Sequence, residues 1–327
     1  MKNSTAPNRK TGRMIAKNLI VLFAVALAGF CGIQAWFTDN RSAEANGIEV
    51  ECQAPDGIEI AVVGHDAPAP TEYTTGNITL NKTNYPFLEK LQLTEITGDG
   101  TFFRKPALIQ SGGQAHVDTK AEWSEPTANE HYLSFDLYIR SKSQYNISIG
   151  KKSTIKPDAP QLTTQDGTGI KNQSKYGNFS RDSVVGAVRF SVVDYKSAPP
   201  SKKLLWLPAP NILLKQTTDE YTLSDDMPSG ESYSHVYYDT NRVQHTVSST
   251  DVDKAFVVNN DGFDGGKFTY ELGQNQNIAQ LNKSSENDQF CSAMVTCNMW
   301  IEGEDAEARL ALVNGKFKVN LVLTKVS

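Results

Sequence analysis

Residues 132–141 read YLSFDLYIRS, and apolar and polar side chains alternate along this stretch. In an extended chain the apolar set points to one side and the polar set to the other. The two sets are Leu133, Phe135, Leu137 and Ile139, and Ser134, Asp136, Tyr138 and Arg140. A period of two is typical of a β-strand with one face against a core. The stretch therefore predicts a strand in a sheet that covers a hydrophobic interior.

The same alternation returns in GAVRFSVVD at 186–194 and in KFKVNLVLT at 316–324. Turn sequences such as Pro55–Asp56–Gly57 separate the strand candidates. Shorter candidates are GIEVEC (47–52), GIEIAVV (57–63), HVYYD (235–239), KAFVVNN (254–260) and KFTYEL (267–272). No segment keeps a helical period for long. The sequence predicts a mainly β protein, a jelly-roll-like antiparallel β-sandwich with short helices and long loop insertions.

The amino-terminal 35 residues have the composition of a secretory signal. Residues 1–18 carry five Lys or Arg and no acid, and residues 19–35 are uncharged and almost wholly apolar. We expect a signal peptidase to cut after Ala35, so that Trp36 becomes the first residue. Ala43–Glu44–Ala45 offers a second small-residue cut site. Because 17 apolar residues are near the lower limit for spanning a bilayer, an uncleaved anchor is the alternative.

Charge and length limit the partners of the cleaved chain. Without residues 1–35 it keeps 27 basic and 37 acidic residues, a net charge of −10. Nucleic acid and anionic lipid both reward clustered Lys and Arg, so neither is expected as a partner, and no membrane contact is expected after cleavage. Residues 36–327 are predicted to form a single β-sandwich domain. Polar residues 151–183 predict a long exposed loop, and an excursion from the sandwich is predicted at about 197–285.

Three cysteines stay in the cleaved chain, because Cys31 leaves with the signal. An odd number allows at most one intrachain disulfide. Cys291 and Cys297 are close enough in sequence to close a small loop, and Cys52 could pair with either instead. The spacing is not that of a zinc site.

An acidic group, Glu302, Glu304, Asp305 and Glu307, raises the question of a metal site. Residues 304–312 instead predict a short helix, whose first turn favours carboxylates through the helix dipole. Asn314–Gly315 would end that helix before the last strand. The five histidines are scattered, and no nucleophile elbow or phosphate-binding loop occurs. We therefore predict no catalytic, cofactor or metal residues and no enzyme.

Ala35 and the WFTDN that follows it (36–40) resemble the export signal of the TasA/camelysin family, which a SipW-type signal peptidase cuts before an aromatic residue. YLSFDLYIRS, GAVRFSVVD and residues 299–324 also look like segments of such secreted proteins. The resemblance covers the signal and about half of the rest. It implies a jelly-roll-like domain exported to the surface or biofilm matrix of a Gram-positive bacterium.

TasA-like proteins form fibres when the amino-terminal strand of one subunit completes the sheet of the next, so the resemblance implies a donor strand. GIEVEC and GIEIAVV are the candidates, with Gly47, Ile48, Val50, Ile58 and Ile60 as donor-strand residues. Camelysin is described as a metalloprotease, but this chain has no matching ligand set. The alternative is a carbohydrate- or host-binding adhesin that uses aromatic side chains. Its candidates are Trp206, Tyr233, Tyr237 and Tyr238, although Trp206 within LLWLP also fits a core position.

Overall fold

The computed structural model describes residues 49–111, 114–157, 187–208, 214–216, 221–223, 236–246, 256–258, 270–303 and 317–326. The chain divides into two units, Met1–Ser42 and Ala43–Ser327, and every described residue belongs to the second. The described part is mainly β, as predicted. Its one helix is a short 3-10 turn, η1 (Pro86–Leu88). The helix predicted at 304–312 lies outside the described residues.

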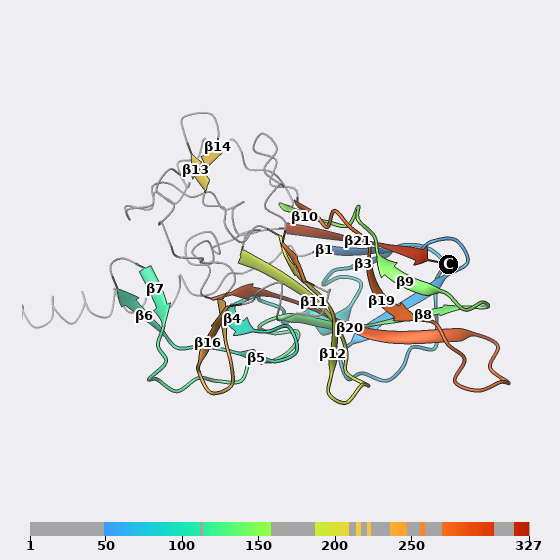
Figure 1. Cartoon of the computed structure of the whole chain (residues 1–327), viewed down its shortest axis with the longest axis horizontal. Coiled ribbons are helices and arrows are strands. Elements are labelled where there is room, and N and C mark those ends of the chain that lie inside the picture. The colour runs from blue at the N-terminus through green and yellow to red at the C-terminus, as the bar shows by residue number, and fades with distance from the viewer. Residues whose placement is uncertain are drawn as a thin grey trace, which may run out of the picture. The chain divides into compact units, whose positions relative to one another are not determined.

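Two large sheets form the body of the protein (Figure 1). Sheet A has the order β18-β10-β21-β1-β3, with β9 beside β21 and β19 beside β9. Its strands are β18 (Tyr270–Glu271), β10 (Thr154–Pro157), β21 (Phe317–Val326), β1 (Glu49–Gln53), β3 (Ile78–Leu80), β9 (Asn146–Ile149) and β19 (Gln276–Gln280).

Sheet B has the order β17-β12-β11-β20-β4-β5, with β8 beside β20 and β2 beside β8. Its strands are β17 (Phe256–Val258), β12 (Ser201–Leu207), β11 (Val188–Asp194), β20 (Cys291–Glu302), β4 (Glu95–Gly98), β5 (Phe103–Arg104), β8 (Leu133–Ser141) and β2 (Glu59–Gly64). Three two-stranded ribbons are separate from both sheets. They are β6–β7 (Leu108–Ser111, Gln114–Val117), β13–β14 (Leu214–Gln216, Tyr221–Leu223) and β15–β16 (Val236–Tyr238, Gln244–Thr246).

One hydrophobic core joins the inner faces of the two sheets, which confirms the sandwich. Sheet A contributes Val50, Phe317 and Val319, and sheet B contributes Phe135, Phe190 and Trp206. Each of these six side chains is at most 1% exposed. Both sheets are mixed rather than purely antiparallel, because β1–β21, β12–β17 and β20–β4 pair in parallel. The jelly-roll connectivity stays a prediction.

The predicted excursion at about 197–285 is too long. Its first part contains β12, a strand of sheet B, and its last part contains β18 and β19, strands of sheet A. Residues 151–183 also contain β10, which pairs with β21. The strand candidates at 254–260 and 267–272 do contain β17 and β18, strands of sheets B and A, so these two were correctly identified as strands but wrongly assigned to the excursion. The strands β10, β12, β17, β18 and β19 within these intervals therefore belong to the sandwich itself.

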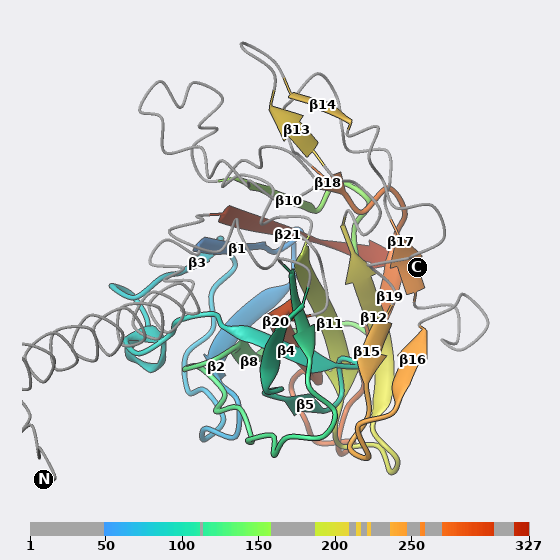
Figure 2. The same cartoon turned by 90° about the vertical axis from the view of Figure 1, so that its left-hand side faces the viewer.

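Strand β8 contains the alternating stretch, and its first five residues are buried on both faces, whereas Tyr138 and Arg140 are half-buried. Leu133, Phe135, Leu137 and Ile139 face the core, with exposures of at most 1%. Ser134 and Asp136, on the opposite face, are also buried. A second apolar cluster lies on the outer face of sheet B, made of Ile96, Phe103, Leu205, Leu207 and Trp300. The outer face of sheet B is therefore covered over part of its area, near the end where β4 and β5 continue the sheet beside β20 (Figure 2).

Gly100 brings the covering loop onto sheet B. Its φ is +90°, which L side chains rarely adopt, and its carbonyl oxygen accepts a hydrogen bond from the Ser191 hydroxyl at 2.7 Å. A Cβ at this position would lie 2.8 Å from the Cβ of Ser191. Gly57 also has a positive φ, +74°, but a Cβ there would meet nothing within 4 Å. A side chain at Gly57 would therefore add backbone strain alone, whereas a side chain at Gly100 would add both strain and steric overlap.

We expect Gly100→Ala to lower the free energy of unfolding by about 2–4 kcal/mol, because strain and overlap add. Gly57→Ala, the matched control, should cost only about 1 kcal/mol. Urea denaturation of both variants measures the difference. Equal losses would mean that the loop does not pack on Ser191 in solution.

Candidate functional site

The first described strand, β1, fills a place in sheet A between β21 and β3, which we call the β1 slot. It pairs in parallel with β21, Glu49 opposite Lys318 and Gln53 opposite Val322, and antiparallel with β3. Val50 is 1% exposed and Cys52 0%. On the other face, Glu49 forms an ion pair with Lys318 at 3.3 Å, and the Asn77 amide donates to Glu51 at 2.8 Å.

The candidate donor-strand residues belong to two different strands. Val50 lies in β1, whereas Ile60 lies in β2 and Ile58 just before it. Gly47 and Ile48 lie outside the described residues. Both candidate strands pair within this chain, and β1 and β2 lie in opposite sheets. The turn between them, where the Ile58 amide donates to the Pro55 carbonyl, therefore carries the chain from one sheet to the other.

Strand β2 is fixed to β8 by a clamp around Arg140. The guanidinium contacts the same Glu59 oxygen through Nε at 2.7 Å and Nη2 at 2.6 Å. Its central carbon lies 3.8 Å from the ring centre of Tyr73 and 4.3 Å from that of Phe290. A planar cation between two aromatic rings combines ionic and cation–π stabilisation. The clamp holds the first residue of β2.

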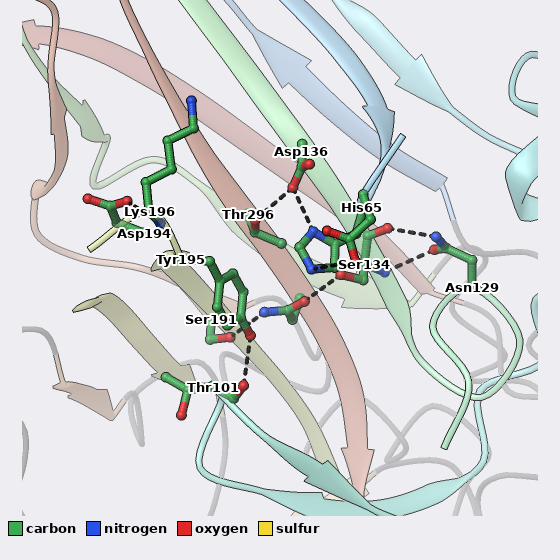
Figure 3. A network of polar contacts seen from close by, with 12 residues as sticks. His65, Thr101, Asn129, Ser134, Asp136, Ser191, Asp194, Tyr195, Lys196 and Thr296 are labelled. Atoms are coloured by element: carbon green, nitrogen blue, oxygen red, sulfur yellow. Dashed lines mark hydrogen bonds and ion pairs between the residues drawn. The ribbon is translucent and has the colours of Figure 1, made fainter. Parts of the chain in front are cut away.

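A second charged contact holds the chain just after β2 (Figure 3). His65 Nδ1 lies 2.9 Å from Asp136 Oδ1, and the Thr296 hydroxyl donates to the same oxygen at 2.6 Å. Asp136 is on β8 and Thr296 on β20, so the contact joins three segments of the chain. His65 Nε2 lies 3.6 Å from Asp66 Oδ2. Both ring nitrogens therefore face carboxylates, which favours an imidazolium ion over a base that activates a nucleophile.

Hydrogen bonds extend this network across the outer face of sheet B (Figure 3). The Ser134 hydroxyl donates to Asn298 Oδ1 at 2.7 Å, and Asn298 Nδ2 lies 3.4 Å from both Ser191 Oγ and the Gly100 carbonyl oxygen. The Tyr195 hydroxyl donates to the Thr101 carbonyl at 2.8 Å. Buried polar groups are costly unless they are hydrogen-bonded, and here they bond one another. The sequence did not predict this hydrogen-bond network. Its only signal there is the set of polar side chains in the alternating stretch of β8.

This packing raises the pKa of two side chains, His65 and Tyr195. The hydrogen bond to Asp136 is the main cause that raises the pKa of His65 above its usual 6.5, against an opposing effect of burial. Burial raises the pKa of Tyr195 to about 12, so its hydroxyl keeps its proton and remains a donor. His65 also stacks against Tyr195, with ring centres 5.3 Å apart. The network is suited to holding loops on the sheet.

The raised pKa makes the contribution of His65 to stability depend on pH. Protonation is favoured in the folded state, so the contribution is complete below pH 6.5 and is lost as the pH rises through the folded pKa. We expect the stability difference between the native protein and His65→Gln to shrink between about pH 5 and pH 9. Urea denaturation across this range measures it. A difference that grew with pH would contradict the assigned contact.

The three described cysteines are free thiols. Cys291 and Cys297 lie six residues apart on one extended strand, β20, so their Cα atoms are about 20 Å apart. A disulfide needs about 4.4–6.8 Å, so the predicted Cys291–Cys297 bridge is wrong. Burial raises the pKa of Cys52 to about 12 and that of Cys297 well above its usual value. The prediction failed because it read a long strand as a loop.

We expect none of these thiols to react with a thiol reagent while the protein is folded, because the thiolate is the reactive form and all three are buried. After denaturation, three thiols per chain should react in a protein of residues 36–327. Absorbance of the released thiolate counts them. A count of one after denaturation would show that two are oxidised, against this structure.

The aromatic residues of the adhesin alternative have different surroundings. Trp206 is fully buried and Tyr238 is 8% exposed. Tyr237 is half-buried, with the exposed His245 stacked on it at 5.3 Å and Phe102 at its edge at 6.1 Å. Tyr233 lies outside the described residues. The core interpretation of Trp206 is confirmed.

Other predicted sites lie outside the described part of the chain, including Ala35, Trp36 and three of the four acids at 302–307. Glu302 is described and buried at the end of β20. Among described residues, no group of three or more His, Cys, Asp or Glu side chains could hold a metal ion. No helix in that part is long and apolar enough to cross a membrane. Comparison with protein-family models, curated proteins and solved structures gave no match for this chain.

Proposed function

We propose that this chain is an exported, non-enzymatic protein of the cell surface or extracellular matrix, and that its copies join by exchanging β1. The observation that supports the proposal is the β1 slot. A strand near the amino terminus is hydrogen-bonded on both sides and inserts two side chains, Val50 and Cys52, into the core. The β1 strand of another copy would fill the same slot with the same contacts.

Exchange needs a strand that leaves at limited cost. Removing Val50 and Cys52 from the core costs about 1.5–3 kcal/mol for each apolar side chain, besides the paired backbone groups. A second copy restores these contacts, because the incoming strand is identical. With cleavage after Ala35, residues 36–48 precede β1, so no long segment has to follow the strand. The number of contacts is thus nearly the same before and after exchange, and the concentration of the protein determines how much exchange occurs.

The clamps on β2 limit the exchange to β1. Glu59 is held by Arg140, and His65 by Asp136, at the two ends of β2. The turn with Gly57 lies between the fixed strand and the exchanging one. It would act as the hinge, where a positive φ is already accommodated. This arrangement keeps the sandwich closed while a single strand moves.

The export signal and the WFTDN segment support location outside the cell, on a Gram-positive bacterium, with a signal peptidase as the partner during export. The acidic balance supports a soluble protein that avoids nucleic acid and anionic lipid. The resemblance to TasA-like proteins supports a biofilm fibre as the assembled form. A jelly-roll-like topology belongs to the same proposal.

An adhesin that binds carbohydrate is the second candidate. Half-buried aromatic side chains gather near the β15–β16 ribbon, where Tyr237 stacks on His245 and Arg242 lies 5.9 Å from the ring centre of Trp123. Sugar rings stack on such side chains. The described rings already contact one another, however, so strand exchange is the stronger proposal.

Variants that each carry one added cysteine, beside the three buried native thiols, test the exchange. Glu51 and Thr79 face each other across β1 and β3. We mix Glu51→Cys and Thr79→Cys versions of residues 36–327, incubate them at assembly concentration and oxidise. Only a β1 strand inserted into another copy brings the two cysteines together, so we expect a disulfide-linked dimer on a non-reducing gel, and fibres by electron microscopy.

The matched control mixes Asn146→Cys with Gln280→Cys. These residues also face each other, on β9 and β19, but neither strand exchanges in the proposal. No dimer should form. A dimer in the control alone, or in neither mixture, would overturn strand exchange, and glycan binding would then be the next test.

A further inference from the structure

The outward face of β1 is acidic, and its slot carries a cation. Glu49, Glu51 and Gln53 are the outward, half-buried side chains of the strand. Lys318 of β21 lies 3.3 Å from Glu49, and Asn77 donates to Glu51 at 2.8 Å. The slot therefore complements β1 in charge on one face and in apolar shape on the other.

We infer that Glu49 and Lys318 form the charge-selective contact through which one copy of this chain accepts the first strand of another. The inference rests on the proposed strand exchange. Charge complementarity selects partners and suppresses wrong pairings more than it adds affinity. A net charge of −10 in the cleaved chain makes copies repel one another, so a complementary contact inside the joint favours the correct strand.

The location of the pair suits selection. Each side chain is 38% exposed, so the charges are neither deeply desolvated nor fully screened. Contacts of this kind contribute about 0.2–1 kcal/mol, and like charges in the same place oppose pairing by a similar amount. The pair also lies at the first described residue of β1, where an incoming strand can be recognised before its core residues insert.

Exchange has a specific consequence for charge-reversed copies. In a uniform population, the contact inside one chain and the contact between chains are the same, so reversing one charge changes both equally. A mixture differs. Within a Glu49→Lys chain two lysines face each other at this position, and within a Lys318→Glu chain two glutamates do, so both contacts inside a chain are repulsive. When the two chains exchange β1, a lysine faces a glutamate in each slot, and both contacts between chains are attractive. Mixing the two should therefore favour exchange between them.

The experiment combines these changes with the cysteine pair. Glu49→Lys is added to the Glu51→Cys chain, and Lys318→Glu to the Thr79→Cys chain. We expect the complementary mixture to give on the order of tenfold more cross-linked dimer than the chains with native charges at low salt. Either charge reversal mixed with a native-charge chain should match the native level. The excess should disappear in about 1 M salt, where the Debye length is about 3 Å.

Lys120→Glu is the control for net charge, because Lys120 is exposed in the turn after Asp118 and far from β1 in sequence. In place of Lys318→Glu it should give no excess. Equal cross-linking in all mixtures would overturn the charge-selective contact while leaving strand exchange intact. No cross-linking in any mixture, including native charges, would overturn the exchange itself.

Discussion

The structure depends on burying both faces of β20. This strand, Cys291–Glu302, pairs with β8 on one side and β11 on the other, and its far end also pairs with β4. Met299 and Cys297 face the core, and Trp300 and Asn298 face the outer cover, all at most 1% exposed. From Val295 to Glu302 the strand is buried on both faces, so the polar side chains in this part cannot bond to bulk water. The outer face of sheet B must therefore supply its own partners.

That requirement explains why the outer face of sheet B has an apolar part and a separate hydrogen-bonded polar part. Trp300 lies with Phe103 in an apolar cluster, their ring centres 5.1 Å apart. Further along, Thr296 and Asn298 bond to Asp136 and Ser134 of the neighbouring strand. Thr296 and Asn298 thus find partners on an adjacent strand and on the loop at Gly100. These hydrogen bonds hold the covering loop to the sheet, which agrees with a structural role for the His65 network.

The sequence predicted the sandwich because β8 and β21 alternate clearly, and both strands supply core residues as expected. It did not predict β20. The central residues of this strand, VTCNMW, show no simple alternation of apolar and polar side chains, because a strand that is buried on both faces has no solvent-exposed side. For the same reason, the stretch from Cys291 to Cys297 was interpreted as a loop. The contact of His65 with Asp136 joins residues 71 apart, which no local pattern reveals.

Sheet A differs from sheet B in a way that bears on assembly. In β1 and β21 buried residues alternate with half-buried ones, so the outer face of sheet A is less covered. Moving β1 therefore disturbs one core layer, whereas moving a strand of sheet B would disturb two. β1 is also the first described strand, and β2 behind it is clamped at both ends. Compared with β2, which has four buried residues and is clamped at both ends, β1 has two buried residues and lies nearer the amino terminus, which is why exchange is proposed for β1.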